Sequence, residues 1–198
     1  MIMQHLTMII SKGQTKVAQY GYYNGEPAEK GLQVLRFLQS CNLQTFSEKV
    51  NQLSFFTSKE AKQLCKVENW EKQYPQLNPK VEVDILNMIY SGQVNQLIDG
   101  EIYAADSMFC KWAYVIDLDK NILEIYRGNQ TFPLEKTERF YKFQTHIEEV
   151  KEMYYPIKWI QSYPLTKLPN EKDFVADLME EKEVYRIKFF TDKDLDNK

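Results

Sequence analysis

The chain has 198 residues, of which 43% are hydrophobic and 27% are charged, and its formal net charge is −3 at neutral pH. These values describe a globular chain long enough to bury a core, and they exclude collagen-like, disordered and disulfide-rich proteins. The slight acidic excess also argues against a general nucleic-acid-binding protein, which usually carries basic residues that neutralise phosphates.

The first residues predict a β-hairpin. Residues 4–11 and 15–22 are rich in β-branched and aromatic residues, which favours two strands. Lys12, Gly13 and Gln14 lie between them, and glycine permits the positive φ of a tight turn.

A glycine-rich segment, Gly21–Gly31, follows this hairpin. Four of the seven glycines lie in the first 31 residues, which makes this segment the strongest compositional anomaly of the chain. Glycine could bring backbone N–H groups close to an anion, or the segment could be a long turn from a strand to a helix. Because Tyr22 and Tyr23 lie in this segment and Tyr20 adjoins it, and all three would offer stacking area, we expect a solvent-open recognition segment.

Three or four helices are expected between residues 31 and 92. Apolar residues recur at helical spacing in 31–40, and both Thr45–Glu48 and Thr57–Glu60 have the form of a capping box. Asn78 and Pro79 form a cap and a first turn, and Gly92 could end the helix that follows them.

The middle of the chain predicts a second hairpin, from 112–118 to 122–126. Its first strand is apolar on both faces, which is typical of a strand covered on both sides of a sheet. After it we expect further elements in a fixed order: a strand at 138–144, a helix at 145–154, a surface segment with Pro156, Pro164 and Pro169, a helix capped by Asn170, and a strand at 184–190.

These elements predict one α+β domain over residues 1–198. A mixed or antiparallel sheet would be built from the N-terminal hairpin and the central strands, and helices would pack on it as a layered sandwich. The acidic tail, 192–198, is expected to fray.

The chain offers few ligands for a metal. Cys41, Cys65 and Cys110 lack paired spacing, and the only histidines are His5 and His146. A disulfide framework or a closed zinc site is therefore not expected, and we predict neither a metal nor a cofactor. The acidic residues after position 116 imitate an EF-hand loop but lack its glycine and its glutamate.

The chain also shows no run of about 18 apolar residues and no basic segment before the first apolar stretch. The sequence therefore predicts a cytoplasmic protein that does not associate with membranes.

Catalysis is the main alternative to binding. Asp106, Ser107, Cys110 and Lys111 lie within six residues, so a hydrolase or transferase could use Asp106 and Cys110. In a strand, however, Cys110 would face away from Lys111, and no histidine lies nearby, which favours a core cysteine.

The histidines and the N-terminus suggest little chemistry. His5 lies on an apolar strand and is expected to be a satisfied structural residue, whereas His146 is expected to be exposed. The N-terminal hairpin is also compatible with an N-terminal-nucleophile-like fold. The first hydroxyl of the chain belongs to Thr7, however, so such a fold would lack activity without cleavage before that residue.

Two blocks of the sequence form a recognisable pattern. The first, at the start, contains His5-Leu-Thr7, Lys16-Val-Ala-Gln-Tyr-Gly21 and Asn24-Gly25-Glu-Pro27, and the second is Asp106-Ser-Met-Phe-Cys-Lys-Trp-Ala-Tyr-Val-Ile-Asp117. Both resemble blocks of a family of small uncharacterised bacterial and phage proteins. The chain departs from the pattern: Tyr22 and Tyr23 replace Gln and Trp, Asn24 replaces Asp, Glu26 replaces Tyr and Lys111 replaces Glu. The resemblance implies a phage or mobile-element accessory protein but no particular reaction.

The sequence therefore favours a non-enzymatic binding protein. Its partner would be a small polar ligand or a host protein, and in a phage setting the binding would counter host defence. Self-association through aromatic residues stays open. The predicted binding residues are Tyr20, Gly21, Tyr23, Asn24, Gly25, Asp106, Ser107 and Arg127.

Overall fold

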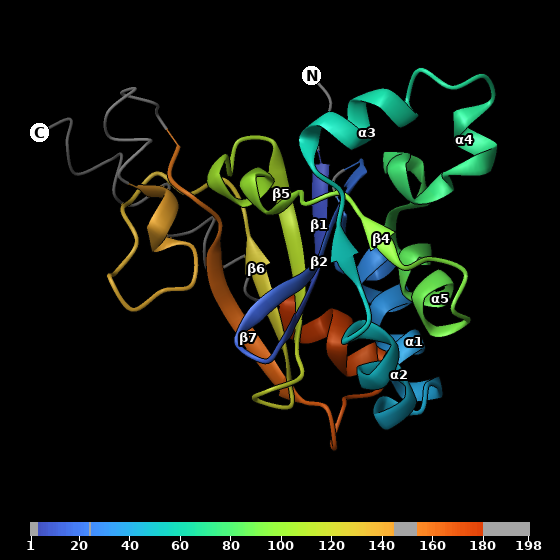
Figure 1. Ribbon diagram of the computed structural model, residues 1–198. Coiled ribbons are helices and arrows are strands. Elements are labelled where there is room, and N and C mark those ends of the chain that lie inside the picture. Colours follow the sequence, from blue (N-terminus) through green and yellow to red (C-terminus); the bar gives the residue numbers. More distant parts are fainter. Residues whose placement is uncertain (1–3, 24, 145–153, 180–198) are drawn as a thin grey trace, which may run out of the picture.

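The computed structural model describes residues 4–23, 25–144 and 154–179, and its centre is a mixed β-sheet (Figure 1). β1 and β5 run parallel, and the other neighbouring strands run antiparallel. The α+β prediction is therefore confirmed. In spatial order the strands are β2 (Gln14–Tyr22), β1 (Gln4–Ser11), β5 (Cys110–Asp117), β6 (Ile122–Arg127) and β7 (Lys158–Pro164).

Helices and short turns connect these strands. The helices are α1 (Leu32–Ser40), α2 (Leu43–Val50), α3 (Ser58–Leu64), α4 (Trp70–Gln73), α5 (Ile85–Tyr90) and a helix at 171–179. Single turns of other helical types are Pro27–Gly31, Pro75–Leu77, Pro79–Asp84, Glu101–Ala105 and Tyr141–Phe143. A small parallel pair, β3 (Ser54–Phe55) and β4 (Gln96–Leu97), lies beside α5 in Figure 1.

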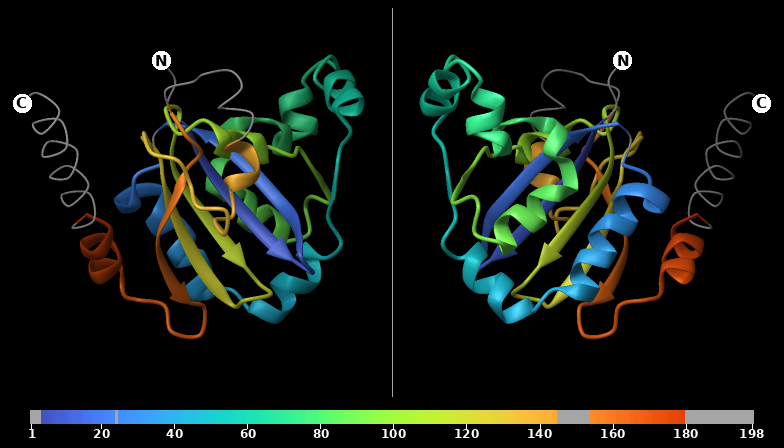
Figure 2. Two further views of the ribbon diagram at one scale, coloured as in Figure 1. Left: turned by 90° about the vertical axis from the view of Figure 1, so that its left-hand side faces the viewer. Right: turned by 90° about the vertical axis from the view of Figure 1, so that its right-hand side faces the viewer.

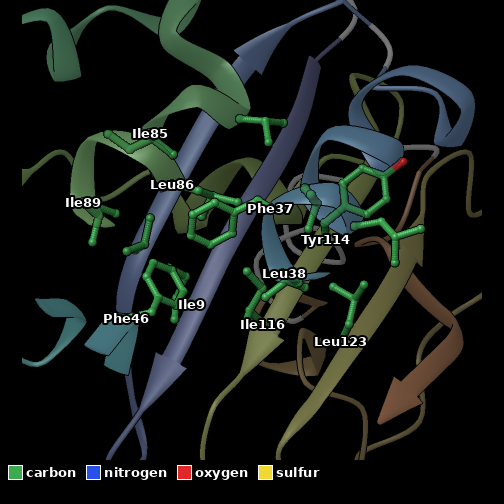
Figure 3. Packing of buried hydrophobic residues seen from close by; sticks show 14 of the residues in the cluster. Ile9, Phe37, Leu38, Phe46, Ile85, Leu86, Ile89, Tyr114, Ile116 and Leu123 are labelled. Carbon is green, nitrogen blue, oxygen red and sulfur yellow. The ribbon is translucent and has the colours of Figure 1, made fainter. Parts of the chain in front are cut away.

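One face of the sheet, called the helix face below, packs against helices. In the right-hand view of Figure 2, α1 and α5 stand in front of the strands. Figure 3 shows Phe37 and Leu38 of α1 packed near Ile9 and Ile116 of the sheet. The apolar stripe of α1, buried at i, i+1, i+3 and i+4, is what holds the helix there.

The opposite face of the sheet is covered mainly by the loop 128–144, with the single helical turns Glu101–Ala105 and Tyr141–Phe143. Leu134 and Phe140 pack there with Ala113 and Val115 of β5. The left-hand view of Figure 2 shows this covering segment in front of the strands. The alternating residues of β5 thus enter two separate cores, which confirms the prediction of a strand covered on both sides.

The two predicted hairpins are both present, and they are tied to each other. Lys12 and Gly13 both have positive φ, 54° and 68°, as a two-residue hairpin turn demands. The backbone N–H groups of Lys12 and Gly13 donate to the carboxylate of Asp119, at 2.8 and 2.7 Å. Because Asp119 lies in the turn of the second hairpin, it fixes one turn against the other.

The helix starts were predicted with mixed success. The capping box at Thr57 and Glu60 is present, but the one expected at Thr45 and Glu48 is wrong. α2 begins three residues earlier, because its cap is Asn42 and not Thr45: the side chain of Asn42 accepts the backbone N–H of Thr45 at 2.9 Å. Asn170 caps the helix at 171–179 as expected, accepting the backbone N–H of Asp173 at 2.9 Å.

The observed structure differs most from the sequence prediction in the region after residue 137. The strand expected at 138–144 is wrong, because the chain there forms turns that bury Phe140 in the second core. The next strand is β7, within the segment expected to wrap the surface. β7 is an edge strand, where a terminal proline such as Pro164 removes no ladder hydrogen bond that the sheet needs.

Several expected elements lie outside the described residues. These are the helix at 145–154, apart from its last residue, the strand at 184–190 and the tail at 192–198. Within the described residues, no helix has the length and apolar character needed to cross a membrane.

Candidate ligand-binding site

Two of the predicted binding residues, Gly21 and Arg127, lie in one row across the helix face of the sheet. Gly21 of β2 pairs with His5 of β1, His5 pairs with Trp112 of β5, and Trp112 pairs with Arg127 of β6. The guanidinium of Arg127 lies 5.2 Å from the centre of the Trp112 ring. In the next row Thr7 lies between Gln19 and Tyr114.

The glycines of the Gly21–Gly31 segment are buried, and the side chain of His5 explains two of them. A Cβ on Gly21 would lie 2.4 Å from Cε1 of His5, and one on Gly25 would lie 2.2 Å from its Cβ. Gly25 also has a φ of +70°. The chain therefore needs glycine at both positions because it folds directly onto the imidazole, rather than because it is an open loop.

Tyr23 is the part of this segment that faces solvent. Its side chain is 73% exposed, and its backbone has a positive φ of 67°, which is uncommon for a bulky residue. Asn24, predicted as a binding residue, lies outside the described residues. The prediction of an exposed tyrosine is confirmed, whereas the expectation of a wholly open segment is not.

Tyr114, on β5 of the sheet, holds the Gly21–Gly31 segment in place. Its buried hydroxyl donates to the carbonyl oxygen of Gly25 at 2.8 Å. A Cβ on Gly31 would lie 2.8 Å from the same hydroxyl oxygen, so this glycine too is set by close packing. Figure 3 shows Tyr114 reaching up from β5 toward the chain that precedes α1. Burial raises the pKa of Tyr114 well above its usual value, so the hydroxyl stays protonated and remains a donor.

Two side chains beneath this segment are buried without hydrogen bonds of standard geometry to the described residues. His5 and Thr7 are both 0% exposed, and neither ring nitrogen nor the hydroxyl makes such a bond, although the backbone of Tyr22 and Tyr23 lies close enough to the imidazole for weak hydrogen bonds. An unmet buried polar group costs about 1–3 kcal/mol. Burial lowers the pKa of His5, as does Lys30, while Glu82 and the backbone of Tyr22 and Tyr23 act against that shift. His5 is therefore neutral at physiological pH.

An ion pair between Lys30 and Glu82 lies beside His5. The two side chains are only 15% and 12% exposed. Cγ of Glu82 would lie 3.0 Å from a Cβ on Gly21, so Glu82 borders the same place as the imidazole. Its backbone, at φ 51° and ψ −129°, is strained for a residue other than glycine. Such strain occurs preferentially at functional sites.

We call His5, Thr7, Lys30, Glu82 and Tyr114 the His5 cluster. Buried polar atoms without partners are rare in folded proteins, and each calls for an explanation such as a ligand or a bound water. The His5 cluster combines two such side chains with a shielded ion pair and a strained carboxylate. It can therefore offer a neutral imidazole, a hydroxyl and two opposite charges to one ligand.

The structure places Tyr20 away from the His5 cluster. Its ring packs against the second core and stacks on Tyr103, with centroids 4.1 Å apart. Burial and the Tyr103 hydroxyl raise the pKa of Tyr20. Tyr20 thus serves to attach the turn Glu101–Ala105 to the sheet.

Asp106 and Ser107 shape the turn that leads into β5. The carboxylate of Asp106 accepts the backbone N–H of Met108 at 2.9 Å, and Oγ of Ser107 accepts that of Gln130 at 2.8 Å. Ser107 is fully buried. Both side chains hold the backbone in place, which ties the start of β5 to the chain after β6.

Cys110 is enclosed in the second core. It is 0% exposed, and its Sγ lies 3.6 Å from the carbonyl oxygen of Trp112. Burial, with a further contribution from the carboxylate of Asp106, raises the pKa of the thiol to about 12. A thiol that is both enclosed and protonated is a poor nucleophile, so this geometry favours the core cysteine over the catalytic alternative.

The sequence analysis missed most of the His5 cluster. It treated His5 as satisfied and Thr7 only as a hydroxyl near the N-terminus, and it gave Lys30, Glu82 and Tyr114 no role. One signal was present: His5 and Thr7 are two residues apart in an otherwise apolar strand, which places both on one face. Among the described residues, no group of three or more His, Cys, Asp or Glu side chains is arranged to hold a metal ion.

Comparisons with known proteins add no family to this geometry. No family model matches the chain, and neither a curated protein nor a solved structure matches it.

Proposed function

We propose that this protein binds a small polar ligand at the His5 cluster, beneath and beside the Gly21–Gly31 segment. One observation carries the proposal: His5 and Thr7 are completely buried side by side on β1 and make no hydrogen bond of standard geometry to the part of the chain that the structure describes. A ligand that supplied the missing partners would recover the free energy that these two groups cost the folded protein.

The chemistry of the surrounding groups indicates the kind of ligand. Tyr23 presents an exposed aromatic ring next to the cluster, and aromatic rings stack on flat, unsaturated ligands. The imidazole of His5 and the hydroxyl of Thr7 each both donate and accept hydrogen bonds. A nucleoside has this combination of a flat ring and a hydroxyl-bearing end, so nucleosides and nucleotides are the first candidates.

Entry of the ligand requires movement of the segment around Tyr23 and Gly25, because His5 and Thr7 are not accessible in the structure. Tyr23 has a positive φ, which is strained for a residue other than glycine, and such strain is concentrated at ligand clamps and switch regions.

The test is a thermal-shift screen of nucleosides, nucleotides and sugars, with hits measured by calorimetry. A ligand at about 100 times its dissociation constant stabilises the folded protein by about 2.7 kcal/mol. We expect Tyr23→Ala and Lys30→Met to weaken a hit at least about tenfold, which is about 1.4 kcal/mol of binding free energy.

The matched control is Phe132→Ala, because Phe132 is 63% exposed and lies outside the cluster. It should leave the affinity unchanged. A screen without a hit, or a hit that is equally sensitive to Phe132→Ala and Tyr23→Ala, would contradict the proposal.

The biological setting is part of the same proposal. It rests on the resemblance of the Lys16–Pro27 and Asp106–Asp117 blocks to phage and bacterial proteins. In that setting, sequestering a small polar ligand or engaging a host protein would interfere with host defence. Co-expression with individual defence systems, comparing the wild type with Tyr23→Ala, measures this directly.

A further inference from the structure

A second candidate site lies on the face of the sheet opposite the helices. It is a pocket of about 650 Å³, within the size range of small-molecule sites. Its walls come from β6, β7, the turn between β5 and β6, and the segment at 135–139. Its lining includes the cations Lys120, Arg139 and Lys158, the carboxylates Glu124, Glu135 and Glu138, and the ring of Trp159.

The base of this pocket is a fixed arrangement of charges. Nη2 of Arg139 donates to Asp117 at 2.6 Å and to Glu124 at 2.7 Å, and Nε donates to Glu124 at 3.0 Å. The hydroxyl of Tyr126 donates to the same oxygen of Glu124 at 2.9 Å. Burial raises the pKa of Tyr126, and so does Glu124, which keeps that hydroxyl a donor. These contacts hold the guanidinium and the carboxylate in position before any ligand arrives.

Part of this hydrogen-bonding capacity remains unused. All the contacts to Glu124 above go to Oε2, while Oε1 has, among the described residues, only the ammonium of Lys120 at 3.7 Å. Glu124 is nevertheless 91% shielded at its side chain. The Nζ atom of Lys158 lies 4.0 Å from Glu138, too far for a hydrogen bond. One buried carboxylate oxygen and one ammonium can therefore accept and donate to a ligand.

The remaining wall supplies apolar contact. Trp159 is 46% exposed although it is a large aromatic residue. It lies opposite Tyr126 in the pairing of β6 with β7, so its ring stands beside the charged base. Tryptophan in this position can stack on an apolar or cationic part of a ligand.

The balance of charges in the lining indicates the ligand. Three cationic side chains and three carboxylates line the pocket. A ligand with one kind of charge would be attracted by half of them and repelled by the other half. We infer that the pocket binds a small zwitterion, a free amino acid or a short peptide, with its ammonium group at Glu124, its carboxylate at Lys158 and its side chain against Trp159. This inference is independent of the function proposed for the His5 cluster.

The experiment is calorimetry with free phenylalanine, arginine and glutamate and the dipeptide Gly-Phe, each compared with its N-acetylated and its C-amidated form. We expect at least one free zwitterion to bind at least about tenfold more tightly than both of its blocked forms. Trp159→Ala and Lys158→Met should each weaken that binding about tenfold.

Two matched control residues lie in the loop 128–144, near the pocket but not in its lining. Phe132→Ala removes an exposed aromatic ring and Lys136→Met an exposed ammonium, and neither residue lines the pocket. Both should bind as the wild type does, and so should Tyr23→Ala, which affects only the other site. All these positions are at the surface, and unchanged melting temperatures confirm that the variants fold.

Three results would each overturn the inference. The first is that no free zwitterion binds when it is tested at concentrations up to about 10 mM. Every dissociation constant would then be weaker than about 1 mM. The second is equal affinity for the free and the blocked forms. The third is binding that survives both Trp159→Ala and Lys158→Met.

Discussion

The two faces of the central sheet treat buried polar groups in opposite ways. On the face that carries the loop 128–144, Asp117 and Glu124 are buried, but Arg139 bonds to both of them. On the helix face, His5 and Thr7 are buried just as deeply and make no hydrogen bond of standard geometry to the described residues. The buried charges of one face are therefore paired within the protein, whereas the buried polar groups of the other face are not.

The buried polar groups of the two faces therefore contribute differently to the stability of the folded protein. A satisfied network such as that of Arg139 is favourable only while all its members are present, because the loss of one leaves a buried charge unpaired. An unsatisfied pair such as His5 and Thr7 lowers stability from the outset, which is why we propose that a ligand completes its hydrogen bonds. The comparison can be tested by removing one group from each face.

The largest effect is expected from Arg139→Met. The change leaves Asp117 and Glu124 buried without their guanidinium, and breaking such a pair costs about 3–5 kcal/mol of unfolding free energy. Urea denaturation monitored by circular dichroism measures the loss. The matched control is Arg36→Met, which removes the exposed pair with Glu171 and should change stability little. Equal losses in the two variants would show that the Arg139 network is not a buried one.

A smaller loss is expected from Gly25→Ala, which tests how tightly the segment lies on His5. The positive φ alone costs roughly 1–2 kcal/mol. The new Cβ would also lie 2.2 Å from Cβ of His5, which adds roughly 1–3 kcal/mol of overpacking. Gly13→Ala separates the two causes, because Gly13 has a similar φ of +68° with nothing within 4 Å. If both variants lose the same stability in urea, the close approach to His5 is wrong.

The parts of the fold that were predictable from sequence are those with local causes. Both hairpins follow from turn residues and strand composition, and the capping box at Thr57 follows from residues three positions apart. The two-sided burial of β5 follows from its lack of alternation. Each of these signals lies within about ten residues of the chain.

The missed parts depend on distant residues. β7 forms because β6 offers it an edge, and nothing within 156–164 alone distinguishes an edge strand from a surface loop. The turns at 138–144 form because Phe140 and Arg139 find partners on β5 and β6 rather than pairing as a strand. The sequence therefore held the residues for these contacts but not the tertiary packing that selects them.

The candidate site depends on contacts between distant residues even more than the fold does, and was therefore harder to predict from the sequence. The sequence analysis interpreted the glycines as signs of an open segment, whereas Gly21 and Gly25 are needed because the imidazole of His5 lies against them. The cluster gathers residues 5, 7, 30, 82 and 114, which no spacing rule connects. Of the binding residues predicted from the sequence, Gly21, Tyr23 and Gly25 lie next to the His5 cluster.

The smallest effect, and the most direct test of the comparison, is expected from Thr7→Val. Valine has nearly the same shape as threonine, so the change removes the hydroxyl without opening a cavity. Because that hydroxyl has no partner among the described residues, its removal should stabilise the protein by about 1 kcal/mol, whereas the loss of a bonded hydroxyl destabilises.

Thr57→Val is the control, since the Thr57 hydroxyl accepts the backbone N–H of Glu60 and its loss should cost about 1 kcal/mol. Urea midpoints that move in opposite directions support the unsatisfied site. A Thr7→Val variant that is less stable than the wild type would show that the hydroxyl is bonded in solution, and His5 would then be the only unmet group left to argue for a ligand.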